Sequence, residues 1–212
     1  DVCSSDLGGA FVQAESELAG INMVIGASSC GVRALTASSG PGISLKQEGI
    51  STLCDEGLPA VVITQVRYGN GLGTLFTSQC DYHRETRGGG QGDYRCIVLC
   101  PSSIQEFVDL MLPAYELAEK YRIVTIMMGE GTLGQMMEPV ELPDFVEPKR
   151  TPWALNGHYT YKKIGIFERD SMAEAVELRA KYAEIKENEQ RWEEEDIADA
   201  DYVFVAYGVP GR

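Results

Sequence analysis

Two acidic residues, Glu15 and Glu17, lie where a predicted strand leads into a predicted helix. Acids in the first turn of a helix commonly complement the helix dipole and need no further function. The residues that follow are small and apolar, so we expect at least one of the two carboxyl groups to be buried. A buried carboxyl group can share a proton with a bound molecule. Residue spacing alone leaves both interpretations open.

A second candidate is the loop at residues 38–42, with the sequence SSGPG, just ahead of a predicted helix. Its serines, Ser39 among them, and its backbone amides, including that of Gly40, suit an anion or a carbonyl oxygen. The alternative is a turn that glycine and proline form for steric reasons. From spacing alone, the turn is the favoured interpretation.

Arg67 opens a third, glycine-rich region that extends to residue 95. It follows an apolar strand at residues 60–66, and ligands of α/β proteins bind at the carboxyl ends of such strands. The paired N–H donors of an arginine suit a carboxylate. A surface ion pair is an equally good interpretation of Arg67.

Other catalytic and metal-binding patterns are absent from the sequence. There is no G-x-x-x-x-G-K-[ST] loop, and no G-x-G-x-x-G opens a helix after a strand. His83 and His158 are far apart, and we expect both to be exposed. None of the six cysteines forms a C-x-x-C pair, which favours free thiols in a reducing cytosol over a metal or cluster site.

Composition narrows the class of protein. The chain has 212 residues with 18 basic and 32 acidic side chains, a net charge of −14. This balance argues against a general nucleic-acid or anionic-membrane binder, because either role needs a basic face. Hydrophobic residues make up 44%, which is enough for a core, and no apolar stretch is long enough to span a membrane.

Short apolar runs alternate with helical patterns along the chain. Strands are expected at residues 10–13, 33–37, 60–66, 96–100 and 123–128, and helices at 14–30, 43–56 and 103–121. Ser102 or Ser103 can cap the last of these helices, with Glu106 completing a capping box. This alternation predicts an α/β fold with a mostly parallel sheet and flanking helices.

The expected domain organisation has four parts. Residues 1–7 resemble a translated sequencing adapter and are left out of the fold prediction, and residues 8–138 form the α/β domain. Residues 139–200 form a proline-rich linker and a charged helix, whose charges indicate a solvated face. Residues 201–212, with a strand at 202–207, begin a second domain, so the chain is expected to be a fragment of a longer polypeptide.

Several of these segments also resemble a known family. Residues 13–23 (QAESELAGINM) and 38–51 (SSGPGISLKQEGIS) are similar to the alpha subunit of 2-oxoacid:ferredoxin oxidoreductases. Residues 88–95 (GGGQGDYR) and 134–140 (GQMMEPV) resemble its branched-chain type, which acts on 2-oxoisovalerate (3-methyl-2-oxobutanoate). The resemblance extends over about residues 8–208.

The resemblance implies cofactors and partners. This subunit would carry the pyrimidine-binding half of a thiamine diphosphate site, and a beta subunit would supply the diphosphate and Mg²⁺ half. Iron–sulfur [4Fe-4S] clusters would lie in partner subunits, coenzyme A would be a co-substrate, and ferredoxin would accept the electrons. The implied reaction is the cytoplasmic oxidative decarboxylation of a branched-chain 2-oxoacid to an acyl-CoA, with the chain inactive alone and neither nucleic acid nor membrane as a partner.

The resemblance also implies residue roles. Glu15 matches the catalytic glutamate that hydrogen-bonds the aminopyrimidine ring, with Glu17 as the second choice and Ser39 beside the cofactor. Arg67 matches a ligand of the substrate carboxylate, and Ser39 and Gly40 would line the same pocket. The chain departs from the family at Tyr68 and Cys80, where a glycine is usual, and it lacks the family's earlier Tyr-Pro-Ile-Thr stretch.

Two alternatives remain beside the branched-chain assignment. The chain could belong to a 2-oxoglutarate- or pyruvate-type member of the same family. It could also be a non-catalytic subunit that keeps the fold and pairs with a partner.

Overall fold

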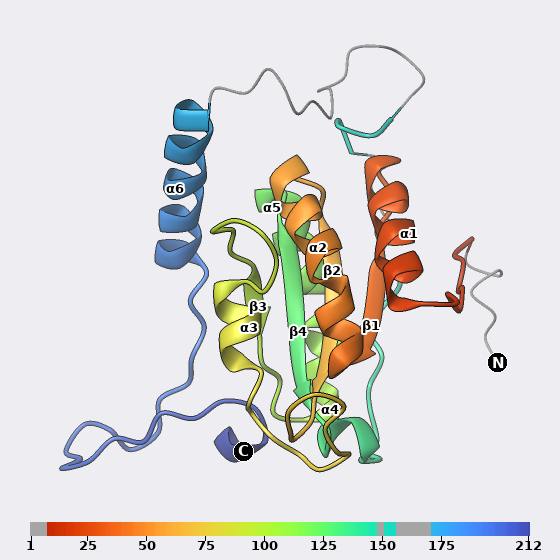
Figure 1. The fold of residues 1–212 in the computed structure, drawn as a ribbon. Coiled ribbons are helices and arrows are strands. Elements are labelled where there is room, and N and C mark those ends of the chain that lie inside the picture. The colour runs from red at the N-terminus through yellow and green to blue at the C-terminus, as the bar shows by residue number, and fades with distance from the viewer. Residues whose placement is uncertain (1–7, 148–150, 156–170) are drawn as a thin grey trace.

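The computed structural model describes residues 8–147, 151–155 and 171–212 (Figure 1). In this part of the chain, four strands form one parallel sheet in the order β1-β2-β4-β3. The strands are β1 (Leu35–Ser39), β2 (Ala60–Val66), β3 (Ile97–Leu99) and β4 (Val124–Glu130). The helices are α1 (Glu17–Ser29), α2 (Pro41–Glu56), α3 (Tyr82–Arg87), α4 (Ile104–Asp109), α5 (Met111–Tyr121) and α6 (Ser171–Asn188), with 3₁₀ turns η2 (Leu133–Gln135) and η3 (Val209–Gly211).

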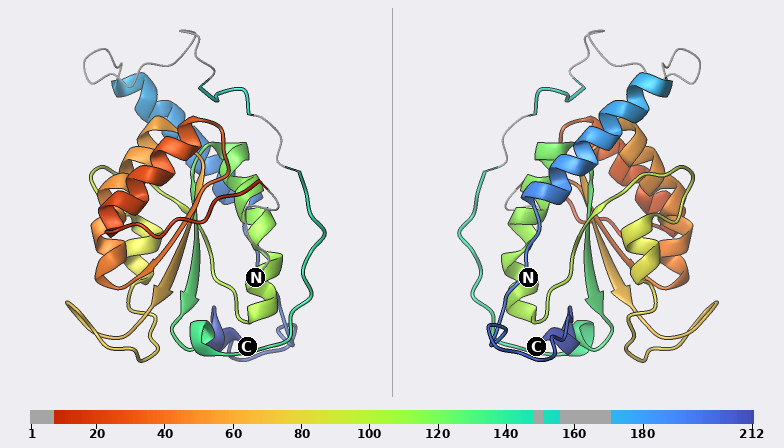
Figure 2. Two further views of the ribbon diagram at one scale, coloured as in Figure 1. Left: turned by 90° about the vertical axis from the view of Figure 1, so that its right-hand side faces the viewer. Right: turned by 90° about the vertical axis from the view of Figure 1, so that its left-hand side faces the viewer.

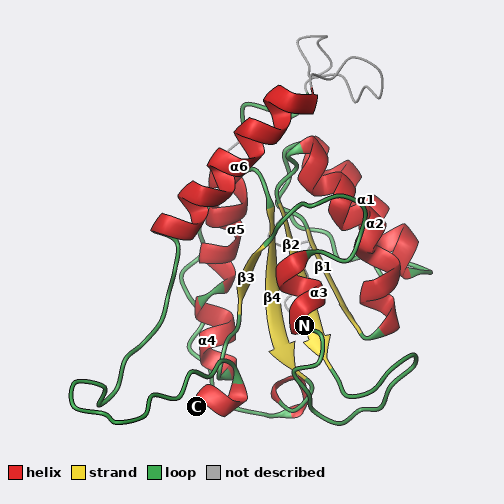
Figure 3. Ribbon diagram, turned by 60° about the vertical axis from the view of Figure 1, so that its left-hand side comes forward, coloured by secondary structure: helices red, strands yellow, loops and turns green. Residues whose placement is uncertain are grey.

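Helices cover both faces of the sheet. Figure 2 shows α1, α2 and α3 on one side and α4 and α5 on the other. Figure 3 shows α6 running beside α5. Parallel strands with helices on both faces confirm the α/β prediction, because each crossover must pass through a helix that covers the sheet.

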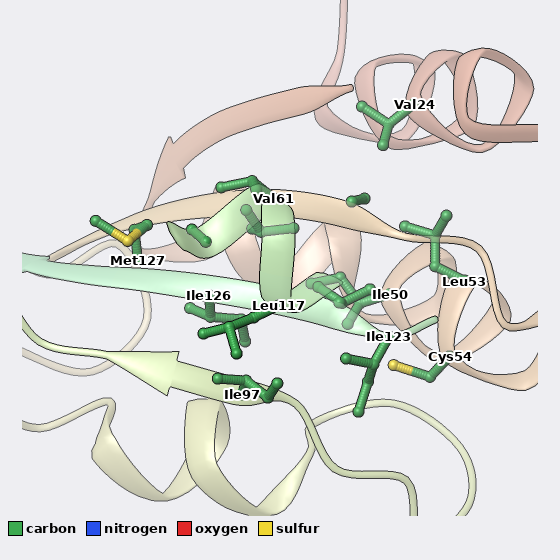
Figure 4. Packing of buried hydrophobic residues seen from close by; sticks show 14 of the residues in the cluster. Val24, Ile50, Leu53, Cys54, Val61, Ile97, Leu117, Ile123, Ile126 and Met127 are labelled. Atoms are coloured by element: carbon green, nitrogen blue, oxygen red, sulfur yellow. The ribbon is translucent and has the colours of Figure 1, made fainter. Parts of the chain in front are cut away.

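The core lies between the sheet and its two helical layers (Figure 4). Val61 and Ile126 come from the central strands, Ile50 from α2 and Leu117 from α5. All seven residues of β4 are buried, which is typical of a central strand with both faces covered. This rigid centre holds the loops at the carboxyl edge of the sheet.

Local sequence explains where the helices begin and end. Ser16 caps α1 by accepting a hydrogen bond from the Ala19 amide at 3.2 Å. Pro41 occupies the first position of α2, and Gly57 ends that helix in the left-handed conformation with φ +61°. The capping box is also present, because Ser103 Oγ accepts from the Glu106 amide at 3.0 Å and Glu106 accepts from the Ser102 amide at 2.6 Å.

The helix expected over residues 103–121 is two helices, α4 and α5, which meet at Leu110. Pro113 lies in the first turn of α5. Its ring has no N–H and would collide with the carbonyl group of Asp109 in a continuous helix. The break therefore follows from a single proline that the apolar periodicity hides.

Two expected strands are wrong. Residues 10–13 and 202–207 form no strand in the described structure. β1 is an edge strand that pairs only with β2 among the described residues. Residues 10–13 do not pair with its other edge. The side chains of Phe11 and Phe204 are exposed, at 86% and 95%. An apolar sequence without a pairing partner does not become a strand.

Other boundaries differ by a few residues. β1 spans Leu35–Ser39 rather than 33–37, so residues 38 and 39 belong to the strand and not to the loop. Pairing with β2 sets this boundary, because Ser39 lies opposite Gln65 in the register. The glycine-rich region contains the short helix α3, which the sequence reading missed.

Towards the carboxyl end, α6 is charged as expected, but two of its residues, Tyr182 and Ile185, pack against the core. Residues 1–7 and His158 lie outside the described residues, and the division of the chain into four parts stays a prediction. Among the described helices, none combines the length and the apolar character that crossing a bilayer requires.

Candidate functional site

The residues singled out from the sequence gather at the carboxyl edge of the sheet. β1 ends at Ser39, and β2 ends at Val66, directly before Arg67. These two strands are neighbours, and Ser39 lies opposite Gln65. The amino ends of α1 and α2 face the same edge (Figure 1), so their unpaired N–H groups and positive dipole ends add to it.

The two acids at the start of α1 differ in their surroundings. Glu15 lies before the helix and is exposed, whereas Glu17 is the first helical residue and is half-buried. The expectation that at least one carboxyl group leaves bulk water therefore applies to Glu17. Of the two acids, Glu17 has the surroundings that suit contact with a bound molecule.

Glu17 lies against the first turn of α2. A Cβ atom on Gly42 would come within 2.9 Å of Glu17 Oε1 and would overlap the hydroxyl oxygen of Ser38. Glycine at this position therefore lets the carboxyl group of α1 and the end of β1 approach the helix. The apparent turn sequence at residues 38–42 thus provides a close three-way contact.

Arg67 lies against the amino end of α2 from the other side. Its guanidinium group approaches Gly40 so closely that a Cβ there would lie 2.7 Å from both Nε and Nη2. Gly40 has φ +51°, a conformation that disfavours other residues. The Nη1 atom donates to the Thr74 carbonyl at 3.4 Å, and Nε is buried without a hydrogen-bond partner in the described structure. A buried unpaired donor on a cation favours an anionic ligand.

A short hairpin holds Arg67 in place. Arg67 pairs with Thr77 in an antiparallel bridge, and the Tyr68 amide donates to the Phe76 carbonyl at 2.8 Å. Glu130, at the end of β4, accepts a hydrogen bond from Thr77 Oγ1 at 3.2 Å. Glu130 is 7% exposed, so this buried carboxylate ties the hairpin to the central sheet.

The two departures from the family lie on or beside this hairpin. Tyr68 is exposed, and the Cys80 thiol donates to the Arg67 carbonyl at 3.4 Å. Both residues therefore contact solvent or backbone rather than the guanidinium group of Arg67. The sequence signalled neither Glu130 nor Thr77 as part of this region.

Lys46 is a second residue that the sequence analysis did not assign. It lies on α2 and is only 3% exposed, although lysine is rarely buried. Its ammonium group donates to Thr36 Oγ1 at 2.6 Å. Burial lowers the pKa of Lys46, and the charge of Glu17 opposes that shift. The signal available in the sequence was its position among Ile43, Gln47 and Ile50 on the buried face of α2.

The GGGQGDYR segment has a structural role in the described chain. The Tyr94 hydroxyl group accepts from the amides of Gly89 and Gly90 at 3.2 and 2.9 Å and donates to Gln47 Oε1 at 3.0 Å. A Cβ on Gly90 would lie 2.5 Å from the Gln47 carbonyl oxygen. This segment therefore binds directly onto α2, and the glycines permit its close approach.

The GQMMEPV segment also has contacts within the chain. Glu138 accepts from the amide of Ile104 at 3.1 Å, at the amino end of α4, and it pairs with Arg212. Gln135 donates to the Leu75 carbonyl at 3.5 Å, so η2 touches the hairpin that begins at Arg67. This segment links the candidate site to α4.

The sequence led us to expect exposed histidines and free cysteine thiols. His83 is exposed, as expected. The five described cysteines are free thiols, with the sulfur atoms of Cys54 and Cys96 3.8 Å apart in the core. Within the described residues, no group of three or more His, Cys, Asp or Glu side chains is arranged to hold a metal ion.

Taken together, the edge presents a half-buried carboxylate, a guanidinium group with a buried unpaired N–H, and backbone brought close by two glycines. Ser39 ends β1, Gly40 lies against the guanidinium group, and both residues are half-buried. A carboxylate can exchange a proton with a ring nitrogen, and a guanidinium group can bind a carboxylate. The site therefore suits a molecule with a basic ring that binds beside a second molecule with an anionic group.

Comparison with known proteins gives a consistent result. A family model described as "Pyruvate flavodoxin/ferredoxin oxidoreductase, thiamine diP-bdg" matches residues 3–201. Ketoisovalerate oxidoreductase subunit VorB of Methanothermobacter marburgensis is 49% identical over 213 residues, which cover 97% of this chain and 60% of VorB. 2-Oxoglutarate synthase subunit KorA of Methanocaldococcus jannaschii is 34% identical, over 97% of this chain and 64% of KorA.

A solved structure is also similar. The 2-oxoglutarate:ferredoxin oxidoreductase from Magnetococcus marinus, with 2-oxoglutarate, coenzyme A and succinyl-CoA bound, matches with a TM-score of 0.59 and 34% identity. The match covers 61% of this chain and 23% of that one. The chain thus spans about 60% of the length of the VorB proteins it matches.

Proposed function

The chain belongs to the thiamine diphosphate-binding family of the pyruvate flavodoxin/ferredoxin oxidoreductases, and we propose that it acts as the alpha subunit of a branched-chain 2-oxoacid:ferredoxin oxidoreductase. The assembled enzyme would convert 3-methyl-2-oxobutanoate and coenzyme A to an acyl-CoA and CO₂ and pass the electrons to ferredoxin. The greater identity to VorB, 49% against 34–40% for the KorA proteins, supports the branched-chain substrate.

The residues at the carboxyl edge fit the pyrimidine half of thiamine diphosphate. Because position 42 is glycine, α2 puts no side chain against Glu17 Oε1, and a ring nitrogen would accept or donate a proton at that oxygen. When bound, the cofactor supplies carbanion stabilisation, which the loss of CO₂ from a 2-oxoacid requires. We propose that a beta subunit holds the diphosphate with Mg²⁺ and that [4Fe-4S] clusters lie in partner subunits.

The position of Glu17 is the observation that carries this proposal. Glu17 is half-buried against Gly42, and we propose that it shares the proton, while Glu15, exposed in the single chain at an edge that the beta subunit would cover, is the alternative that the resemblance favours. A carboxyl group packed against backbone is held in a narrower range of orientations, which favours proton transfer to a bound ring.

Arg67 would bind the carboxylate of the 2-oxoacid. Its buried Nε has no partner in the described residues, so an anion from the substrate would complete its hydrogen bonding. Ser39 and Gly40 would line the space between that anion and the pyrimidine ring. The hairpin tied down by Glu130 would keep the guanidinium group oriented while the carboxylate is lost as CO₂.

A matched pair of variants tests the assignment. The full-length subunit is assembled with its partner subunits, and viologen reduction is measured with 3-methyl-2-oxobutanoate. We expect Glu17→Gln to lower kcat at least about 100-fold, the usual contribution of a positioned proton-transfer group. If Glu17 carries the role, Glu15→Gln, two residues away and before the helix, changes kcat less than about twofold.

The other outcomes each select an alternative. Loss of turnover in Glu15→Gln alone returns the role to Glu15. Full turnover in both variants rejects the acid mechanism, and an assembled complex without turnover on any 2-oxoacid identifies a non-catalytic pairing subunit. A panel of 2-oxoglutarate, pyruvate and 3-methyl-2-oxobutanoate decides the substrate, with the highest kcat/KM expected for the branched acid.

We also propose that the complex works in the cytoplasm. The described cysteines are free, including the adjacent pair Cys54 and Cys96, which agrees with a reducing compartment. Fractionation of cells that express a tagged full-length subunit tests this location.

A further inference from the structure

Two thiols from distant parts of the sequence meet at the edge of the hydrophobic core. Cys54 lies in the last turn of α2 and is 6% exposed, and Cys96 directly precedes β3 and is partly buried. Their sulfur atoms are 3.8 Å apart, in direct contact. Figure 4 shows the Cys54 side chain among the core residues. The function proposed for the carboxyl edge of the sheet uses neither thiol.

The surroundings of this pair suit a bond between the two sulfur atoms. Within the described residues, no third Cys, His, Asp or Glu side chain joins them to hold a metal ion, whereas structural zinc sites and iron–sulfur clusters use four protein ligands. A disulfide needs only the two sulfur atoms, at about 2.0 Å. Cys96 lies outside any helix or strand, so side-chain rotation and a small backbone shift can bring its sulfur atom closer.

We propose that Cys54 and Cys96 form a reversible disulfide when the chain meets hydrogen peroxide, and that this bond ties α2 to the segment before β3. One thiolate attacks the peroxide, the O–O bond breaks, and a sulfenic acid and a first water form. The second thiolate attacks the sulfenic sulfur, the S–O bond breaks, and a second water leaves. Two thiols lose two electrons, the peroxide gains them, and both thiol protons end on water.

Two features of the structure slow this oxidation. The hydrogen bond with Cys54, and then burial, raise the pKa of Cys96 well above its usual range, and a protonated thiol is a poor nucleophile. Tyr182 of α6 packs beside the pair, because its hydroxyl group accepts from the Arg95 amide at 2.9 Å and the Cys54 thiol donates to the Arg95 carbonyl at 4.0 Å. We therefore expect the pair to stay reduced until α6 moves away.

The bond would fix a segment that now rests on α2 through hydrogen bonds and close glycine contacts. The GGGQGDYR segment ends directly before Cys96, and its Tyr94 hydroxyl group donates to Gln47 Oε1 on α2 at 3.0 Å. Cys54 lies two helical turns beyond Gln47 on the same helix. A disulfide there adds a covalent link beside these contacts and restricts the opening of the segment.

Peptide mapping of the full-length subunit tests the bond. The subunit is purified without oxygen, treated with hydrogen peroxide, alkylated and digested without reductant. We expect most chains to give a peptide pair joined at Cys54 and Cys96, which dithiothreitol separates. Cys96→Ala should lose the pair, and Cys30→Ala, at an exposed thiol, should keep it. A folded parent that yields no joined pair, or sulfinic acid at either cysteine instead, overturns the proposal.

The part played by α6 is tested by the rate of the same reaction. We expect Tyr182→Ala to form the disulfide at least about threefold faster than the parent, because it uncovers the thiols. Val176→Ala is the matched control, since Val176 lies on the same helix and is 64% exposed. A rate in Tyr182→Ala equal to that of the parent would show that α6 does not protect the pair.

Hydrogen exchange tests what the bond does to the fold. Exchange is followed by mass spectrometry on peptides that cover residues 88–95, before and after peroxide treatment. We expect oxidation to slow exchange at least about threefold in the parent and to leave it unchanged in Cys96→Ala. Unchanged exchange in cross-linked parent chains would contradict the proposal that the disulfide ties this segment to α2.

Discussion

The guanidinium group of Arg67 packs directly on the backbone of Gly40, with Nε and Nη2 both 2.7 Å from the point where a Cβ would lie. These residues come from different elements, the end of β2 and the start of α2, and 27 positions separate them in the sequence. The contact joins Arg67, the proposed ligand of the substrate carboxylate, to the amino end of the helix that carries Gly42 and Lys46. A side chain at position 40 must displace the arginine.

We therefore expect Gly40→Ala to lower kcat/KM for the 2-oxoacid at least about tenfold, because a small misplacement of a substrate ligand is costly. Steady-state kinetics of the assembled enzyme provides the measurement. Gly71→Ala is the matched control, since Gly71 also has a positive φ, +61°, but nothing lies within 4 Å of its added Cβ. Equal losses in the two variants would attribute the effect to backbone strain and not to Arg67.

The sequence predicted the layers of the fold well because apolar periodicity reports burial. The strand over residues 60–66 matches β2, and the helix expected over residues 43–56 ends with α2 at Glu56. The strand predicted over residues 202–207 is wrong because a strand also needs a pairing partner. Local sequence does not contain that information. Pro113 divided one predicted helix for a steric reason that periodicity does not report.

The candidate site was predicted in part. The segments around Glu17, Ser39 and Arg67 do meet at one edge, because parallel strands place their carboxyl ends together. Glu15 lies before α1 and Glu17 is its first residue, and the sequence alone does not locate this boundary. Lys46 and Glu130 escaped notice because burial of a charged residue depends on contacts distant in the sequence.

The Tyr94 hydroxyl group should contribute measurably to stability. It satisfies the amides of Gly89 and Gly90 and reaches Gln47 on α2, and Tyr94 is 7% exposed. We expect Tyr94→Phe to lower the free energy of unfolding by about 2 kcal/mol, because buried donors lose their acceptor. Denaturant unfolding of the full-length subunit measures this loss. Tyr202→Phe, at an 86% exposed position, should change stability by less than about 0.5 kcal/mol.

Glu130 should control the order of the hairpin that carries Arg67. Its two carboxylate oxygens accept from Thr77 Oγ1 and from Gln79 Nε2, at 3.2 and 2.8 Å. Glu130→Ala removes both acceptors, so both of these bonds are lost. We expect faster hydrogen exchange at the Tyr68 amide, measured by mass spectrometry of the peptide that contains it. Thr77→Ser keeps the hydroxyl group and should keep protection, and unchanged exchange in Glu130→Ala would contradict this role.

The last prediction concerns the cost of burying Lys46. Burial lowers its pKa below the ordinary value of 10.5, and the charge of Glu17 only partly compensates. Between the lowered native pKa and 10.5, the unfolded chain binds the proton that the folded chain releases. Unfolding free energy therefore rises with pH through this window, and below it the protein carries the full cost of the buried charge.

Lys46→Met removes that charge with little change of volume, so we expect the free energy of unfolding at neutral pH to increase by about 1 kcal/mol, as for other buried charges replaced by apolar side chains. The rise of stability towards pH 10.5 should also become smaller, which denaturant titrations over a pH series measure. A residue kept only for packing would show the reverse, with Lys46→Met less stable at every pH.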